Sequence, residues 1–238
     1  MKKITSLTNQ HIKELSELKK AYKRKETQQF LVEGEDFLLL AYEKHRLVEI
    51  LTLEYLPSYQ DVEQIIVTKE ILEKLSFNKS PASVIGLCLF VSSQEIKGNK
   101  LLYLDAVQDP GNVGTLIRTA VAFNYDGVLL SSECASIYNE KVIASSKGAI
   151  FKINLYENVD LLELKKLNYT LISTSLKEAE NYRKYSFKSN FVLVLGNEGQ
   201  GVKKENLAIS DYIVKIEMSE IDSLNVGIAG GILMNEYR

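Results

Sequence analysis

The chain has 238 residues, of which 45% are hydrophobic and 25% charged, a balance typical of a globular protein with one large domain or two modest ones. No apolar run reaches the roughly 18 residues of a membrane span, and no signal-peptide core follows Met1-Lys2-Lys3, so we expect a cytoplasmic protein. The net charge of −2 argues against a strongly electrostatic nucleic-acid binder.

The amino-terminal segment is locally basic, with eight Lys or Arg against three Glu in residues 1–30. Asn9 is predicted to cap a helix in which Ile12, Leu15, Leu18 and Tyr22 recur at helical spacing. The basic residues on and just after this helix are Lys13, Lys19, Lys20, Lys23, Arg24 and Lys25. They form either a stripe against nucleic-acid phosphates or a solvated helix face, and charge alone leaves both open.

The rest of the first 90 residues predicts a small α/β unit. Phe30-Leu31-Val32-Glu33-Gly34 ends the helical pattern, strands are expected at 47–53, 64–68 and 84–91, and helices at 35–43 and 69–75. The polar stretch 92–100 reads as a linker, so we predict two domains, 1–95 and 96–238. Cys88 and Cys134 lie in different predicted elements and are expected to be buried thiols, with no disulfide and no metal site.

Strand and helix patterns alternate through the second domain. Strands are predicted at 101–106, 128–131, 170–173, 191–195 and 212–216, with a further apolar segment at 151–155. Helices are predicted at 111–124, 140–146, 161–167 and from about 223 to the end. Such alternation predicts an α/β domain with a parallel sheet covered on both faces.

The first motif that carries chemistry runs from a strand end into a helix start. Asp109-Pro110-Gly111-Asn112 is a turn sequence, and the amino end of the helix after it favours anionic groups. Arg118 lies about two turns along that helix among apolar residues. An unpaired guanidinium would be costly there, so we expect Arg118 to have a partner or a ligand.

Two more polar segments interrupt apolar sequence near the carboxyl end. Gly196-Asn197-Glu198-Gly199-Gln200-Gly201 follows the predicted strand 191–195, at the strand end where open α/β sheets bind ligands. Its glycines let the backbone approach a bound molecule, and Glu198 adds a charge. Asp222-Ser223-Leu224-Asn225-Val226 precedes the terminal helix, where Asn225 and Ser223 are either site residues or helix caps.

These three motifs, in this order, resemble those of the SpoU (TrmH) family of SPOUT-class RNA 2′-O-ribose methyltransferases. The resemblance covers about residues 100–238. The first 95 residues are similar, more weakly, to the L30e-like RNA-binding domain of that family, through Lys23-Arg24-Lys25 and the segment 30–34. The implied fold is a parallel-sheet SPOUT domain with a trefoil knot, preceded by a small α/β domain.

The resemblance implies S-adenosylmethionine as the cofactor, held mainly by backbone groups. The cofactor-binding residues it implies, with Thr174 added from a neighbouring strand end, are Thr174, Leu195, Gly196, Asn197, Gly199, Gly201, Ile216, Met218 and Leu224. Residues 217–222 lack the proline and glycine that the family has after its last strand, so this loop departs from the family pattern.

The polar active-site positions of the family fall on Asn112, Arg118, Glu198, Ser223 and Asn225. The RNA-binding residues expected from charge and from the resemblance are Lys13, Lys23, Arg24, Lys25 and Arg118. Family members are homodimers with the knot helices at the interface. Lys147 occupies a position where many members have an arginine, and we expect it to be a surface lysine.

The implied reaction is methylation of a ribose 2′-OH in structured RNA, with ribosomal RNA favoured over tRNA. The only histidines, His11 and His45, lie in the first domain, so no histidine base is expected. We expect Arg118 to bind a phosphate and polarise the 2′-OH, while a substrate phosphate oxygen or Glu198 takes the proton.

Two other classes stay open. One is another α/β enzyme that binds a nucleotide phosphate, although no Gly-x-Gly-x-x-Gly or Gly-Lys-Ser/Thr follows a strand. The other is a non-catalytic RNA-binding or ribosome-assembly protein with the same fold.

Overall fold

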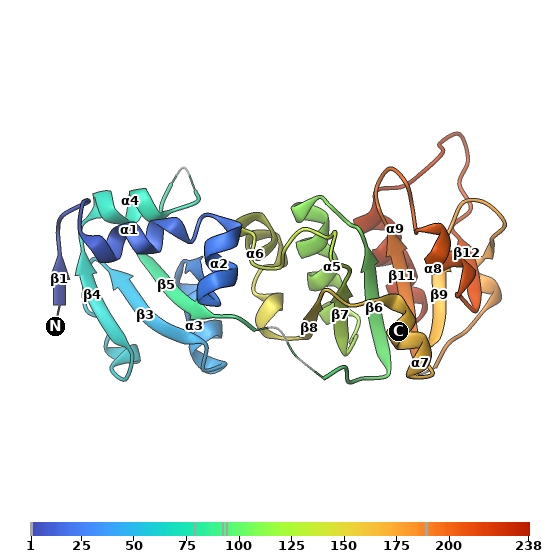
Figure 1. The fold of residues 1–238 in the computed structure, drawn as a ribbon, viewed down its shortest axis with the longest axis horizontal. Coiled ribbons are helices and arrows are strands. Elements are labelled where there is room, and N and C mark those ends of the chain that lie inside the picture. Colours follow the sequence, from blue (N-terminus) through green and yellow to red (C-terminus); the bar gives the residue numbers. More distant parts are fainter. Residues whose placement is uncertain (1, 79, 92, 94, 189) are drawn as a thin grey trace. The chain divides into compact units, whose positions relative to one another are not determined.

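The computed structural model describes residues 2–78, 80–91, 93, 95–188 and 190–238 (Figure 1). The chain divides into two compact units, Met1–Val91 and Ser92–Arg238. This division falls in the polar segment 92–100 that the sequence predicts as a linker, four residues before the predicted boundary at 95/96. Residues 92 and 94 of that linker lie outside the described part of the chain.

The first unit is a five-stranded mixed sheet with helices on both faces. Its strands are β1 (Lys2–Ile4), β2 (Gln29–Glu33), β3 (Leu47–Thr52), β4 (Glu63–Val67) and β5 (Val84–Leu89), in the order β1-β4-β3-β5-β2. Its helices are α1 (Gln10–Glu17), α2 (Ala21–Thr27), α3 (Glu35–Glu43) and α4 (Lys69–Leu75). Strand β4 runs parallel to β1 and β3, whereas β5 is antiparallel to β2 and β3.

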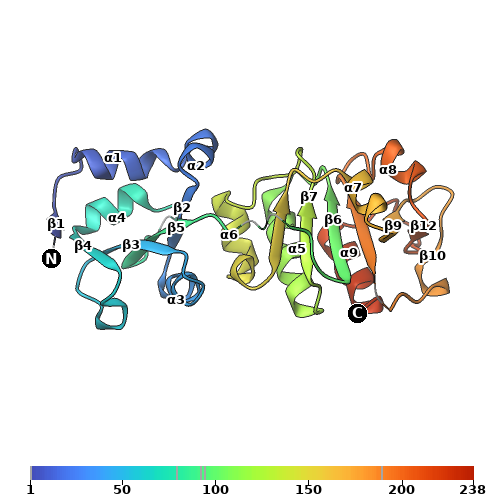
Figure 2. The ribbon, with the colours of Figure 1, turned by 60° about the horizontal axis from the view of Figure 1, so that its bottom comes forward.

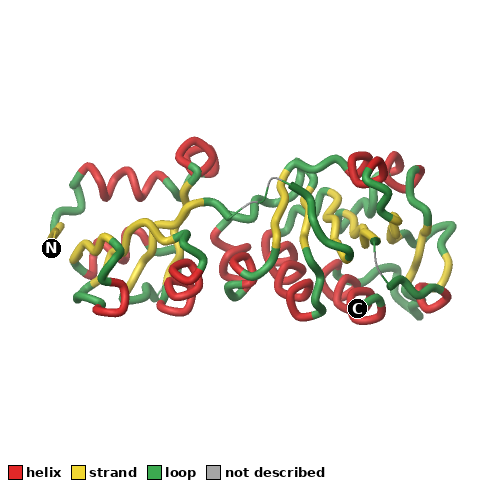
Figure 3. The backbone as a smooth tube through the Cα atoms, turned by 90° about the horizontal axis from the view of Figure 1, so that it is seen from below, coloured by secondary structure: helices red, strands yellow, loops and turns green. Residues whose placement is uncertain are grey.

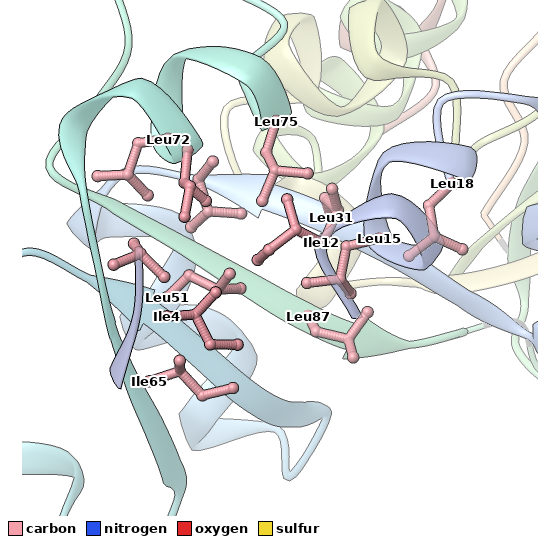
Figure 4. Close-up of a cluster of buried hydrophobic side chains, with 13 residues drawn as sticks. Ile4, Ile12, Leu15, Leu18, Leu31, Leu51, Ile65, Leu72, Leu75 and Leu87 are labelled. Carbon is pink, nitrogen blue, oxygen red and sulfur yellow. The ribbon is translucent and has the colours of Figure 1, made fainter. Parts of the chain in front are cut away.

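Apolar side chains join α1 and α4 to one face of this sheet. Ile12 and Leu15 of α1 and Leu72 of α4 lie in one buried cluster with the strand residues Leu51 and Ile65 (Figure 4). Leu38 of α3 packs against Ile50 and Val84 in a separate cluster. Figure 2 shows α1 and α4 on one side of the strands and α3 on the other.

The predicted amino-terminal helix is two helices, not one. Asn9 caps α1 as predicted, since its side chain accepts from the His11 N–H. The helix ends after Glu17, and Tyr22 lies on α2 with 61% of its surface exposed, so its predicted place in the apolar stripe was wrong. Strand β1 was not predicted.

The second unit is a parallel sheet of seven strands, as the alternation predicted. The strands are β6 (Lys100–Asp105), β7 (Gly127–Leu130), β8 (Asn154–Glu157), β9 (Thr170–Thr174), β10 (Glu180–Asn181), β11 (Phe191–Gly196) and β12 (Tyr212–Lys215). Their order is β10-β12-β9-β11-β6-β7-β8, and all six pairings are parallel. Strand β10, which has only two residues, was not predicted from the sequence.

Helices cover both faces of this sheet (Figures 2 and 3). They are α5 (Pro110–Ala122), α6 (Glu140–Ser146), α7 (Leu161–Lys166), α8 (Lys204–Ala208) and α9 (Val226–Glu236). Helices α5, α6 and α9 pack on one face, while α7 and α8 lie on the opposite face with Leu164 and Leu207 in its buried cluster. Helix α8 was not predicted from the sequence, and α9 begins three residues after the predicted start at 223.

Close packing fixes α9 against α5 and β11. A Cβ at Gly230 of α9 would lie 2.4 Å from Leu116 Cδ2 of α5 and 2.7 Å from Leu195 Cδ1 of β11, so a larger residue would have to displace both leucine side chains. The amino ends of α5 and α9 are thereby held at the same edge of the sheet as the carboxyl end of β11. This edge carries all three sequence motifs.

Within the described residues, no helix is long and apolar enough to cross a membrane. Cys88 is fully buried, as predicted, and burial raises the pKa of its thiol. Cys134 is half-buried and donates to the Leu104 carbonyl at 3.1 Å, so the expectation of a buried thiol was wrong for it.

Candidate active site

The glycine-rich loop after β11 folds back tightly on its own strand end. Asn197 and Gly201 exchange two backbone hydrogen bonds of 3.0 and 2.9 Å. A Cβ at Gly196 would lie 2.1 Å from the Gly201 carbonyl carbon and from the Val202 nitrogen, so only glycine fits there. Gly201 has φ +73°, a conformation that also favours glycine. The loop is therefore a closed backbone structure with a fixed shape.

The Asn197 side chain shapes this loop from within. Its Oδ1 accepts from the Gly199 and Gln200 N–H groups at 2.9 and 3.1 Å, and its Nδ2 donates to the Ala106 carbonyl at 2.8 Å. These bonds use the polar atoms of the side chain. Asn197 therefore supports the loop, and its own side chain is not available to a ligand.

Glu198, at the tip of the loop, reaches across to the turn between β6 and α5. Its carboxylate accepts from the Asp109 and Gln108 N–H groups at 3.2 and 3.4 Å and from Asn112 Nδ2 at 3.0 Å. Partial burial raises the pKa of Glu198, but these donors lower it more, and the pKa lies below its ordinary value of 4.5. Glu198 is therefore a carboxylate at neutral pH and a weak base.

Asn112 and Asn225 extend the same hydrogen-bonded chain to the third motif. Asn225 Nδ2 donates to Asn112 Oδ1 at 3.0 Å, while Asn225 Oδ1 accepts from the Gly227 and Ile228 N–H groups at the start of α9. Asn225 thus caps α9, one of the two alternatives, and the same side chain also contacts Asn112, a candidate site residue. One residue from each motif joins the chain Asn225, Asn112, Glu198.

Arg118 and Ser223 lie outside this chain. Arg118 is exposed on α5, which corrects the expectation that apolar neighbours bury its guanidinium. In the described part of the protein, no hydrogen bond or ion pair involves either side chain, whereas Glu198 accepts from Asn112. A solvated guanidinium with no protein partner is free to bind a phosphate.

The candidate cofactor residues meet at the carboxyl edge of the sheet. Register aligns Gly196 with Asp105 and Val194 with Ser173, and Thr174 Oγ1 donates to the Val194 carbonyl at 3.1 Å. Leu195 is buried against α9, so only its backbone is available to a ligand.

The segment 216–224 has free backbone groups. Its half-buried members Ile216, Met218 and Leu224 follow β12, the neighbour of β9. None of the hydrogen bonds among the described residues involves this segment. Unpaired backbone groups beside a glycine loop fit a cofactor held mainly through the main chain, which is what the resemblance implied.

Two of the four basic candidates in the first unit already have protein partners. Arg24 is 5% exposed, and its guanidinium donates to the Leu18 and Lys19 carbonyls at 2.9 Å, so its location does not suit an RNA contact. Lys23 pairs with Glu26 at 2.9 Å. Lys13 and Lys25 are exposed and make no ion pair with the described residues, so they are the better candidates.

Sequence reasoning missed Asp105 among the site-forming residues. Its carboxylate is fully buried at the end of β6 and accepts from the Lys203 N–H. The signal was an acidic residue that directly ends an apolar strand. Lys147 is exposed with φ +49° at the end of α6, a surface lysine as expected, and the described residues contain no cluster of three metal-ligating side chains.

A parallel α/β sheet with a closed glycine loop and a polar chain at its carboxyl edge defines a ligand-binding enzyme domain. The model of the SpoU rRNA Methylase family matches residues 99–235, and that of the MRM3-like substrate binding domain matches residues 9–86.

The chain is 32% identical, over the full length of both proteins, to the 23S rRNA (guanosine(2553)-2′-O)-methyltransferase RlmP of Bacillus subtilis. An rRNA methyltransferase from Sinorhizobium meliloti has a similar structure, with TM-score 0.91, 25% identity and coverage of 99% of this chain and 96% of that one. Its AdoMet-bound form has TM-score 0.90 with the same identity and coverage.

This chain belongs to the SpoU rRNA methylase family. The expected family and the SPOUT-type α/β fold are confirmed. So is the expected class of enzyme, an RNA 2′-O-ribose methyltransferase that uses S-adenosylmethionine.

Proposed function

We propose that this protein transfers the methyl group of S-adenosylmethionine to a ribose 2′-OH in the large-subunit ribosomal RNA. The observation that carries the proposal is the hydrogen-bonded chain of Asn225, Asn112 and Glu198, which joins all three motifs beside the glycine loop. The full-length similarity to an enzyme named for guanosine 2553 of 23S rRNA makes that nucleotide the first candidate. Cytoplasm remains the expected compartment.

The cofactor-binding residues act mainly through their backbone. The Gly196–Gly201 loop presents N–H and C=O groups in a fixed geometry, and the unpaired groups of 216–224 face no other described partner. The bound cofactor supplies an electrophilic methyl group on a sulfonium. The task left to the protein is to align the ribose oxygen with that methyl, since positioning can provide most of the acceleration.

We assign Glu198 a positioning role and not that of the base. Its pKa is lowered, and its two oxygens already accept three hydrogen bonds from Gln108, Asp109 and Asn112. Arg118, exposed and unpaired among the described residues, binds a substrate phosphate and polarises the 2′-OH. Of the two proton acceptors expected from the sequence, a substrate phosphate oxygen and Glu198, we therefore propose the phosphate oxygen.

We also propose a homodimer through α5 and α9, with the trefoil knot of the family in the segment that contains α9. Gly227 of α9 lies against Thr115 of α5, and Ile228 beside it is 59% exposed. Helix α9 therefore presents an apolar side chain to solvent next to its contact with α5, and we place this side chain in the interface. Light scattering should give the mass of two chains for the wild type and of one chain for Ile228→Glu; a wild type that is monomeric at all concentrations contradicts the dimer.

The proposal is tested by mapping 2′-O-methyl groups in total RNA from cells with and without this protein. Loss of one site in the large-subunit rRNA, restored by the wild type but not by Arg118→Ala, is the expected result. Loss of a tRNA site would instead identify tRNA as the substrate. A methylation map without any lost site would count against the enzyme and favour a non-catalytic RNA-binding role.

A further inference from the structure

We propose that Asp105 is a positioning residue for the cofactor, because it holds the segment that directly follows the glycine loop. The inference rests on the proposed cofactor role of this loop. Asp105 is the last residue of β6 and is fully buried. A charged side chain in that setting is costly unless its partners are well placed.

The two partners of one Asp105 oxygen both belong to the segment after the loop. Oδ2 accepts from the Lys203 N–H and from Asn206 Nδ2, each at 2.8 Å. Lys203 is the N-cap residue of α8, and its own side chain makes no capping hydrogen bond. The carboxylate of β6 therefore holds the start of α8, where the glycine loop ends.

Asp105 is the first residue of a short segment, 105–109, that makes several hydrogen bonds to the glycine loop and to the residues after it. The Ala106 carbonyl accepts from Asn197 Nδ2 at 2.8 Å, and the Gln108 and Asp109 N–H groups donate to Glu198. Residues 105–109 thus contact the beginning, tip and exit of the loop. Without Asp105, the Asn197–Gly201 hydrogen bonds would still close the loop, but Lys203 and the start of α8 directly after it would be free to move.

The other Asp105 oxygen has no hydrogen-bond partner among the described residues, although it is buried. Lys203 Nζ lies 3.9 Å from it and pairs with Glu133 Oε2 at 2.6 Å. The hydrogen bond to Glu133, followed by the charge of Asp105, raises the pKa of Lys203. This ammonium supplies the counter-charge but not the hydrogen bonds that hold the loop exit.

The test measures the affinity for S-adenosylmethionine by isothermal titration of the full-length protein, below the unfolding transition of every variant. Asp105→Ala should weaken binding by about tenfold or more, because two buried donors lose their acceptor. Asp105→Asn should stay within about threefold of the wild type, since the amide oxygen can accept both hydrogen bonds.

Asp211→Ala is the matched control. Asp211 also accepts from a backbone N–H, that of Leu171 at 2.9 Å, and pairs with Lys165, but it precedes β12 at the opposite edge of the sheet. Its loss should lower stability without changing the cofactor affinity by more than about twofold. Equal losses of affinity in both alanine variants would show a general structural effect and overturn the proposal.

A second pair of variants keeps the test valid if Asp105→Ala does not fold. Lys203 has φ −58°, which proline can adopt, so Lys203→Pro removes the N–H that Asp105 binds. Lys203→Ala keeps that N–H and removes only the ammonium. We expect Lys203→Pro to weaken binding by about tenfold and Lys203→Ala by less than threefold.

Cofactor binding by Asp105→Ala or Lys203→Pro as tight as that of the wild type would overturn the role of Asp105. If the wild type itself does not bind S-adenosylmethionine, the proposed function fails instead. The two failures are therefore distinguishable.

Discussion

The exposed side chain of Arg118 is accessible to a substrate. Arg118→Ala should bind S-adenosylmethionine within about twofold of the wild type, because no described contact links this side chain to the loop. Single-turnover methylation should fall by about 100-fold or more, since the charge that polarises the 2′-OH is lost. Near-normal transfer by Arg118→Lys, measured with the cofactor bound, would show that the bidentate guanidinium role is wrong.

Glu198 should make the free energy of unfolding depend on pH, and the sign of this dependence follows from its lowered pKa. A carboxylate with a depressed folded pKa contributes stability above its unfolded pKa, near 4.5, and that contribution disappears as the pH falls through the folded pKa. The unfolding free energy of the wild type should therefore exceed that of Glu198→Gln at pH 7, and the difference should shrink below pH 4.5. Denaturant titrations of both proteins across this range measure it, and a difference that grows toward acid would contradict the assignment.

Ala106 adopts φ +57°, which is strained for a residue with a Cβ. Ala106→Gly should raise the unfolding free energy by about 0.5–1 kcal/mol, because glycine adopts this conformation at little steric cost. Ala135→Gly is the control, since Ala135 lies in a nearby loop without a positive φ, and it should be neutral or destabilising. A destabilised Ala106→Gly would show that the methyl group contributes packing that outweighs the strain.

At the scale of elements, the helices and parallel strands with clear patterns were predictable, and the exceptions have physical reasons. Helices α3, α4 and α6 match their predicted ranges because apolar spacing and polar ends agree. The break between α1 and α2 was missed because Arg24, read as a surface charge, turns inward to the carbonyls that end α1. No sequence pattern distinguishes an arginine that binds a helix end from one that binds phosphate.

This interpretation of Arg24 predicts an effect on stability. Arg24→Ala should lower the unfolding free energy by about 1–3 kcal/mol, because the Leu18 and Lys19 carbonyls lose a charged donor. Lys25→Ala, which removes an exposed charge from the same helix, should change it by less than about 0.5 kcal/mol. Denaturant unfolding measures both, and equal small effects would show that the buried guanidinium is dispensable.

The three motifs correctly predicted that polar residues would meet at one edge of the sheet, but they did not predict which contacts these residues make. Asn112, Glu198 and Asn225 do meet, because the parallel register brings their strand and helix ends to one edge. The expected burial of the Arg118 guanidinium was wrong, since it was inferred from the apolar sequence neighbours of Arg118. On a helix those neighbours point to other sides, and only packing shows which side is covered.

At the scale of the whole molecule, we expect the first unit to take part in RNA recognition and the second unit to bind the cofactor and carry out the reaction. Removal of residues 1–95 should leave the cofactor affinity within about threefold, because each unit has its own buried clusters. RNA affinity and its dependence on salt should both decrease, because Lys13 and Lys25 no longer contribute phosphate contacts. Filter binding at several salt concentrations measures this, and an unchanged salt slope would remove the first unit from RNA binding.

The most direct test of the central claim uses the purified full-length protein, methyl-labelled S-adenosylmethionine and ribosomal RNA from cells that lack the protein. After complete nuclease digestion, the label should appear in a single 2′-O-methylated nucleoside, and Arg118→Ala should abolish it. Label on a base, or no label with the wild type under conditions in which the cofactor binds, would contradict the assignment of this site to ribose 2′-O-methylation.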